Sequence, residues 1–141
     1  MLFRVAIISP GFDAFVALNR EILEKYPVKR GDRHDVMSPL KVVGLAQKVE
    51  TTPGDLYDKA TVLLSSSIGA HAFASGNKRT AFFMTRAFLE LNAGAFAVGD
   101  LSEDDGERNR KTLTGIREGF YTHEEIKRWL QDGTIKDFER G

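Results

Sequence analysis

Apolar side chains recur at helical spacing in four long segments of the chain. They mark one face of each of the segments 12–26, 40–49, 56–72 and 81–91. A repeat near 3.6 residues places such positions on one side of a helix, where they can pack against a common core. The segment 81–91 is apolar nearly all round, which predicts that it lies at the centre of the bundle. The pattern therefore predicts an all-α fold.

Serine or threonine followed by proline comes before three of these segments. The first residue suits an N-cap, and the second suits the first helical turn. The loop before the fourth segment is expected over residues 74–78, and residues 92–94 are expected to close that helix. We expect the other three helices to begin at the dipeptides, which are Ser9-Pro10, Ser38-Pro39 and Thr52-Pro53.

Two further helices are predicted later in the sequence. The segment "SEDDGERNRKTLTGI" carries acidic residues first and basic residues later, which matches the dipole of a helix. Thr122 and Glu125 have the spacing of a capping box at the start of a last helix, which Asp132-Gly133 ends. Trp129 lies within that helix and is expected to pack into the core.

Two short segments depart from the helical repeat. Residues 2–8 alternate loosely and are rich in β-branched side chains, which predicts a short strand. Residues 28–37 are polar around Gly31-Asp32, which predicts a loop or a small hairpin. No linker or repeat divides the chain, and its length of 141 residues suits one core. We therefore expect a single domain over residues 1–141.

Composition and charge narrow the classes of function. Lys+Arg and Asp+Glu number 20 each, so the chain lacks the basic excess of a general nucleic-acid binder. It has no cysteine, which excludes a disulfide framework, a thiolate zinc site and a cysteine nucleophile. No signal-peptide pattern and no apolar stretch of roughly 20 residues is present, so no membrane partner is expected. A cytoplasmic protein fits these features.

The stretch "HAFASGNKRT", residues 71–80, gathers the parts of an anion site between two predicted helices. A helix N-terminus offers unpaired N–H groups, and Gly76 lets the backbone approach a ligand closely. Asn77 adds an amide donor, and Lys78 and Arg79 add positive charge. His71, with an ordinary pKa of about 6.5, could serve as a general base. These parts favour transfer of a phosphate-bearing group to a hydroxyl, although on spacing alone a solvated surface loop is the commoner arrangement.

The same ten residues resemble the signature of the Fic/Doc family, His-x-Phe-x-(Asp/Glu)-Gly-Asn-x-Arg. The flanking segments are similar to helices and turns of the Doc, or death-on-curing, branch, so the resemblance covers most of residues 10–132. These segments are "SPLKVVGLAQKV", "DLYDKATVLLSSSIGAHAF", "TAFFMTRAFLELN" and "REGFYTHEEIKRWL".

The resemblance implies a compact helical bundle with a small β-hairpin flap, placed at residues 28–37. The flap of this family pairs with the substrate backbone as an added strand. The resemblance also implies transfer of AMP, or in Doc a phosphate, from ATP or another nucleoside triphosphate to a protein hydroxyl. The implied partners are a protein substrate, with a translation factor as the candidate, and an antitoxin protein, because Doc-like chains are toxins of toxin–antitoxin pairs.

The residues of the motif carry over position by position. His71 resembles the base that deprotonates the target hydroxyl, and Gly76, Asn77 and Arg79 resemble the phosphate-binding nest. Lys78 stands where many AMP-transferring members have glycine. The run Asn-Lys-Arg is instead the Doc version of the motif, so it favours the Doc-like branch.

Three other positions of the resemblance bear on the chemistry. Phe73 resembles the apolar anchor of the motif loop, and Phe82 stands where many Fic members have a second arginine, which Doc-like chains also lack. Ser75 occupies the position of the family's acidic residue, which resembles a Mg²⁺ ligand. A hydroxyl is a poorer ligand than a carboxylate, so use of Mg²⁺ is expected to be weakened. The alternative function is a degenerate member that binds nucleotide or protein and catalyses little.

Other polar residues are weaker candidates. His34 lies in the flap segment, where a polar surface turn is the alternative to a direct role. His123 follows the Thr122 cap and is expected to be exposed and idle, and the scattered histidines argue against a zinc site. The pattern from Thr114 to Glu118-Gly119 matches an inhibitory helix of some Fic proteins. A plain turn before the last helix is the favoured interpretation.

Overall fold

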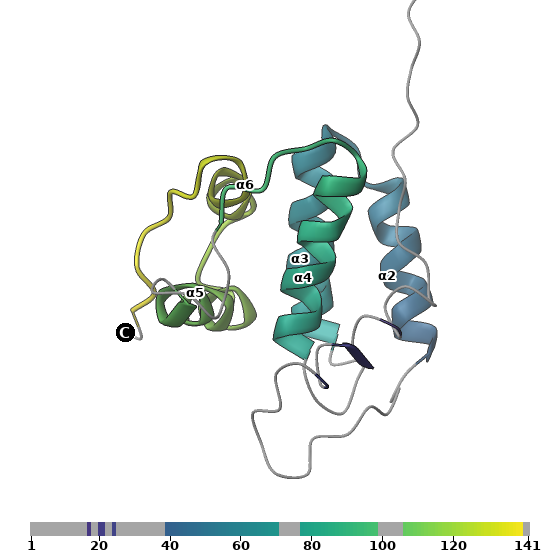
Figure 1. Cartoon of the computed structure of the whole chain (residues 1–141), viewed down its shortest axis with the longest axis horizontal. Helices are drawn as coiled ribbons and strands as arrows, with labels where there is room; N and C mark the ends of the chain where they lie inside the picture. The colour runs from purple at the N-terminus through teal and green to yellow at the C-terminus, as the bar shows by residue number, and fades with distance from the viewer. Residues whose placement is uncertain are drawn as a thin grey trace, which may run out of the picture.

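The computed structural model describes residues 39–70, 77–98 and 106–139, together with positions 17, 20, 21 and 24. This part of the chain is helical and contains no strand, which confirms the all-α prediction (Figure 1). The predicted strand at residues 2–8 and the flap at residues 28–37 lie outside the described residues. The labelled helices are α2 (Pro39–Thr51), α3 (Leu56–Ala70), α4 (Asn77–Leu91), α5 (Gly106–Arg117) and α6 (His123–Asp132).

The four isolated positions agree with a helix in the first predicted segment. Ala17, Arg20, Glu21 and Glu24 have helical backbones and exposed side chains. Their spacing of three or four residues places them on one face of a helix. None of them belongs to the apolar face that the sequence predicts for residues 12–26, so their exposure is what an amphipathic helix requires.

Helix α3 occupies the centre of the described bundle. It packs against α2, α4, α5 and α6. Figure 1 shows α3 and α4 next to each other, with α2 on one side of this pair and α5 and α6 on the other. The sequence predicted the central place for residues 81–91, but among the described helices α3 has it, because α3 packs against four others. Helix α4 also buries side chains, among them Ala81 and Leu89, and keeps a solvent face at Glu90 and Leu91. Helix α3 fully buries four apolar side chains along its length. These are Ala60, Leu63, Leu64 and Ile68.

The start of α3 differs from the prediction at Thr52-Pro53. The Thr52 hydroxyl donates to the Lys48 carbonyl oxygen at 2.6 Å, so Thr52 closes α2 and does not open α3. Asp55 and Asp58 form the actual cap: the Asp58 N–H donates to Asp55 Oδ1 at 3.0 Å, and the Asp55 N–H donates to Asp58 Oδ2 at 2.9 Å. This reciprocal pair satisfies two backbone donors at the helix start.

Lys59 joins α3 to the end of α2. Its ammonium donates to three carbonyl oxygens at 2.8–3.2 Å, which belong to Val49, Glu50 and Thr52. The last carbonyls of a helix lack partners within the helix, and a cation there also interacts favourably with the helix dipole. One lysine therefore satisfies the C-terminal end of α2 and fixes its position against α3.

Helix α4 begins earlier than the sequence indicated. The loop was expected to run to Lys78, but α4 begins at Asn77. The apolar repeat marks only the buried positions, and the first turn of α4 is polar on its outer side, so the repeat could not show it. The predicted end of α4 at residues 92–94 is confirmed. Ala93 has a left-handed φ of 59°, and the N–H of the next residue, Gly94, donates to the Leu89 carbonyl at 2.7 Å.

Helix α6 has the boundaries that its local signals predicted. Thr122 and Glu125 form the capping box, and Gly133 ends the helix with a φ of 78°. The buried side chains of α6 include Trp129, with 2% of its surface exposed, as the sequence predicted. No helix in the described part of the chain combines the length and the apolar character that crossing a membrane would require.

The segment after α6 returns along α5 (Figure 1). The Tyr121 hydroxyl donates to the Lys136 carbonyl at 2.9 Å, and Arg108 pairs with Asp137 at 3.3 Å. Gly115 lets this segment approach, because a Cβ atom at that position would lie 3.0 Å from the Phe138 ring. These contacts hold α5 at a fixed place beside the bundle. The expected charge order of α5 is present, with Glu107 in the first turn and Arg117 in the last.

Candidate anion-binding site at the start of α4

The predicted site residues fall partly within the described chain. Asn77, Lys78 and Arg79 form the first turn of α4, and each is half-buried. The predicted base His71 and the loop residues Ser75 and Gly76 lie outside the described residues. The structure therefore places the amide and the two cations of the motif together at one helix N-terminus.

The charge of this helix turn opposes the helix dipole. Lys78 and Arg79 are both in the first turn of α4, and that turn contains no acidic residue. The N-terminal end of a helix carries a partial positive charge, and a charged side chain there changes stability by about 0.3–1 kcal/mol. Two cations at this end are therefore unfavourable for the helix alone, whereas a helix N-terminus itself favours anions.

A hydrogen bond connects Lys78 to α5. The Lys78 ammonium donates to Thr114 Oγ1 at 3.3 Å, and Thr114 in turn donates to the Arg110 carbonyl at 3.1 Å. Lys78 and Thr114 are 36 positions apart. Sequence reasoning missed this contact, because Thr114 was singled out only for the inhibitory-helix pattern. No local spacing links a residue of one helix to a residue of another.

The buried side of the first two turns of α4 anchors the site to the core. Thr80 and Phe82 each have 1% of their surface exposed. The Phe82 ring packs edge-on against Phe96, with 5.4 Å between ring centroids, and lies 6.4 Å from the Trp129 ring. Position 82, where the resemblance raised the question of a second arginine, is thus an aromatic core position and contributes no charge to the site.

Glu118 and Gly119 form the turn that ends α5. The Gly119 N–H donates to the Ile116 carbonyl at 3.1 Å, and Gly119 has a left-handed φ of 75°. The Glu118 carboxylate lies 3.4 Å from the Arg117 guanidinium, at the surface. The favoured interpretation of a plain turn agrees with this geometry.

His123 is exposed, as expected, but it is not idle. Its Nε2 lies 2.9 Å from Asp58 Oδ1, and the Lys127 ammonium lies 3.1 Å from the same oxygen. The hydrogen bond from His123, the backbone hydrogen bond at Asp55 and the neighbouring Lys127 hold the pKa of Asp58 well below its ordinary value. Residues that are 65 positions apart in sequence thus connect α3 to α6.

Asp58, His123 and Glu124 could in principle hold a metal ion, since one ligand atom from each lies within 4.8 Å of the others. Lys127 argues against this use, because its ammonium already pairs with the Asp58 oxygen that a metal would need. The group is therefore better explained as an ion-pair network between two helices. The expectation that the histidines form no zinc site remains a prediction.

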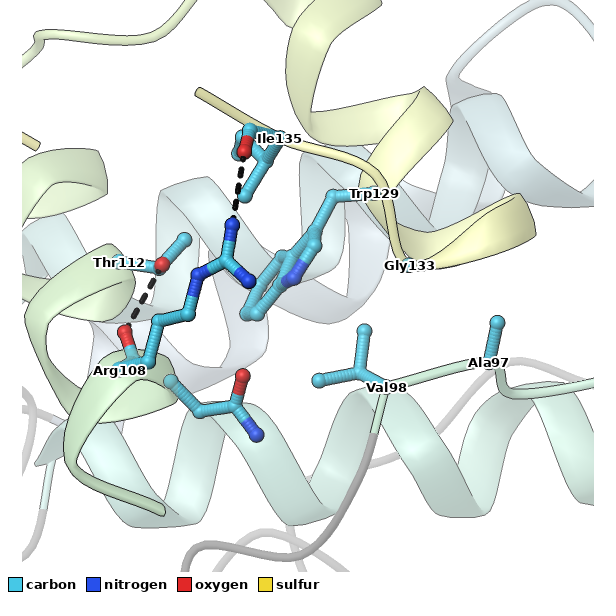
Figure 2. Close-up of a pocket in the computed structure, with 8 residues that line it drawn as sticks. Ala97, Val98, Arg108, Thr112, Trp129, Gly133 and Ile135 are labelled. Carbon is cyan, nitrogen blue, oxygen red and sulfur yellow. Dashed lines mark hydrogen bonds between the residues drawn. The ribbon is translucent and has the colours of Figure 1, made fainter. Parts of the chain in front are cut away.

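A small cavity lies between α5, α6 and the segment after α4 (Figure 2). Its volume is about 100 Å³, and Arg108, Thr112, Trp129 and Ile135 are among the residues that line it. Ligand pockets for drug-sized molecules occupy roughly 300–1,000 Å³. This cavity is too small for a nucleotide, and the residues Asn77 to Arg79 are not among those that line it.

Comparison with known proteins gives one result that bears on this site. The model of the Fic/DOC family matches residues 11–89, a range that contains the motif, α2, α3 and most of α4. Members of this family are in general transferases that act on protein targets. A comparison with curated proteins finds no match. Because the matched range covers more than half of the sequence, the chain belongs to the Fic/DOC family.

Proposed function

We propose that the protein transfers phosphate or AMP from ATP to a hydroxyl of a target protein, as the Doc-like toxin of a toxin–antitoxin pair. Family membership supports a transferase that acts on a protein. The observation that carries the proposal is the first turn of α4, which brings the Asn77 amide and the Lys78 and Arg79 cations together at one helix N-terminus. This arrangement suits a ligand with several negative oxygens.

Each residue of this turn suits a phosphate chain in a different way. The Arg79 guanidinium can donate two parallel hydrogen bonds to one phosphate, whereas the Lys78 ammonium acts as a compact charge. The Asn77 amide adds a neutral donor, and the backbone N–H groups of the first helical turn point along the helix axis. Together they favour the triphosphate of a nucleotide over a single carboxylate.

In the proposed reaction, His71 acts as the general base. It takes the proton of the target hydroxyl while the hydroxyl oxygen forms a bond to phosphorus. Attack at the α-phosphorus releases pyrophosphate and leaves AMP on the target. Attack at the γ-phosphorus releases ADP and leaves phosphate. Lys78 and Arg79 would stabilise the charge that moves onto the leaving group.

The described residues of this site do not fit Mg²⁺. Magnesium is usually held by one or two carboxylates together with phosphates and water. The first turn of α4 supplies an amide and two cations and no carboxylate, and the family's acidic position is Ser75 in this sequence. We therefore assign no step of the reaction to the metal.

The serine also motivates the second candidate function, a binding module with little activity. Such a protein would hold a nucleotide or a protein partner through the same cations but transfer nothing. The proposed partners in either case are a target protein, with a translation factor as the candidate, and an antitoxin protein. A small open reading frame directly upstream would favour the toxin.

Transfer from labelled ATP separates the candidates. The purified protein is incubated with a cell extract and ATP labelled at either the α- or the γ-phosphate. Label from the α position alone identifies AMP transfer, and label from the γ position alone identifies phosphate transfer. His71→Ala should fold normally and transfer no label, and equal transfer by that variant would remove His71 from its role. ATP binding without any label transfer would favour the binding module.

A further inference from the structure

Lys78 and Thr114 connect the motif to a helix that lies beyond the range of the family match. The matched range ends at residue 89, and α5 spans Gly106–Arg117. The start of α4 and α5 lie at the same end of the molecule (Figure 1). The Lys78 ammonium donates to Thr114 Oγ1 at 3.3 Å in a half-buried place. A helix outside the matched range therefore contacts a cation of the proposed phosphate site.

The Thr114 hydroxyl is oriented as an acceptor. A hydroxyl has one hydrogen to donate and two lone pairs to accept, and an ammonium can only donate. Thr114 gives its hydrogen to the Arg110 carbonyl at 3.1 Å, which leaves its lone pairs for Lys78. The direction of both hydrogen bonds is therefore fixed by chemistry.

The turn of α5 that carries Thr114 is firmly packed. Leu113 and Ile116 on either side have 1% and 7% of their surface exposed. A Cβ atom at Gly115 would lie 2.6 Å from Tyr121 Cε2, so the backbone of α5 approaches that ring as closely as glycine allows. The oxygen that accepts from Lys78 is thus held in place by its helix and by the core.

A fixed acceptor matters because lysine has a long and flexible side chain. An ammonium that is already held near its working position loses less freedom when the ligand arrives. A threonine hydroxyl is also neutral, so it orients the ammonium without removing its charge. An acidic residue at position 114 would compete with phosphate for Lys78.

We propose that Thr114 is a positioning residue that holds the Lys78 ammonium toward the phosphates of the bound nucleotide. This inference rests on the proposed function, since it assumes that Lys78 meets those phosphates. It gives α5 a part in nucleotide binding.

The test compares the ATP affinity of five variants with that of the wild type by calorimetry. Thr114→Val removes the acceptor with little change of shape and should weaken ATP binding by roughly threefold to tenfold. Thr114→Ser keeps the acceptor and should restore the wild-type affinity. In a variant that already carries Lys78→Met, Thr114→Val should weaken ATP binding no further, because the two changes remove the same interaction. Thr112→Val is the matched control, since its hydroxyl donates to the Arg108 carbonyl at 3.0 Å on the same helix.

A second measurement does not depend on nucleotide. The NMR signal of the Lys78 ammonium should exchange slowly with water in the wild type and rapidly in Thr114→Val. Thr114→Ala also removes the acceptor but replaces it with a smaller side chain. Rapid exchange in both variants would therefore not be due to misfolding caused by valine alone.

Equal ATP affinity of the wild type and Thr114→Val would overturn the positioning role and would leave the proposed function untouched, because label transfer tests that function separately. The same reduction by Thr114→Val with and without Lys78 would also overturn it. Absence of ATP binding by the wild type would overturn the proposed function and this inference together, even if the ammonium signal shows the contact.

Discussion

Arg79 and Arg86 allow a matched comparison within one helix. Arg79 is in the first turn of α4, whereas Arg86 lies about two turns later and pairs with Glu90 at 3.0 Å on the surface. A charge-assisted hydrogen bond contributes about 1.5–3 kcal/mol. Arg79→Ala should therefore weaken ATP binding by roughly ten- to hundred-fold, and Arg86→Ala should leave it unchanged. Calorimetry measures the ATP affinity of both variants. Equal losses of affinity would show that binding depends on the net charge of the protein and not on the position of Arg79.

Ser75 is the position at which the motif departs from the family's acidic residue. Ser75→Asp restores the family's carboxylate, which a bridging cation needs in order to offset phosphate charge in the transition state. We expect magnesium-dependent transfer to rise by at least roughly tenfold, which corresponds to about 1.4 kcal/mol of barrier. ATP affinity without metal should stay the same or fall through repulsion. Rates over a magnesium titration test this, with Ser75→Asn as the neutral control of similar size. Identical metal dependence in all three forms would show that Ser75 is not limiting.

At the scale of elements, short sequence signals correctly predicted the helix ends that are set by interactions within a few residues. Helix α6 has its cap, its end and its buried tryptophan where the sequence predicted them, because the capping box and the left-handed glycine act within a few residues. The start of α3 was misplaced because Thr52-Pro53 and Asp55-x-x-Asp58 both resemble a helix start, and only the second caps it. Two polar contacts between helices, Lys78–Thr114 and Asp58–His123, have no periodic signature in the sequence.

The Asp58 network predicts how the contact between α3 and α6 responds to pH. The pKa of Asp58 in the folded protein lies below its ordinary value of 3.8. The carboxylate therefore stabilises the fold above about pH 4, and this contribution is lost as the pH falls through the lowered pKa. Asp58→Asn should reduce the free energy of unfolding by about 1–2 kcal/mol at pH 7.

The deficit of Asp58→Asn should shrink below pH 4, where Asp58 of the unfolded wild-type chain begins to take up a proton while the folded form stays ionised. Thermal melting of both forms from pH 7 to pH 3 measures it. The control is Glu90→Gln, which breaks an exposed pair with Arg86 and should change stability by less than about 0.5 kcal/mol. A constant difference between Asp58→Asn and the wild type over the whole pH range would mean that the charge of Asp58 contributes nothing.

At the scale of the whole molecule, the family match covers only part of the helical bundle. Residues 11–89 contain the motif, but α5 and α6 cover the faces of α3 and α4 that the match leaves open. The buried residues of the described helices form one cluster, in which Trp129 and Leu130 of α6 pack with the side chains of α3. The proposed single domain over residues 1–141 therefore needs its last two helices.

Removal of α5 and α6 tests this dependence. A chain shortened to residues 1–105 would expose the side of α3 that α6 covers. It would also lose the contact between the Trp129 and Phe82 rings, whose centroids are 6.4 Å apart. Burial of one large apolar side chain contributes about 1.5–3 kcal/mol, and a domain has only about 5–15 kcal/mol of stability in total. The loss of Trp129, Leu130, Ile126 and Leu113 together should therefore abolish cooperative melting by circular dichroism. A shortened chain that melts cooperatively and binds ATP as the full chain does would show that the matched range folds alone, and that α5 is not needed for the site.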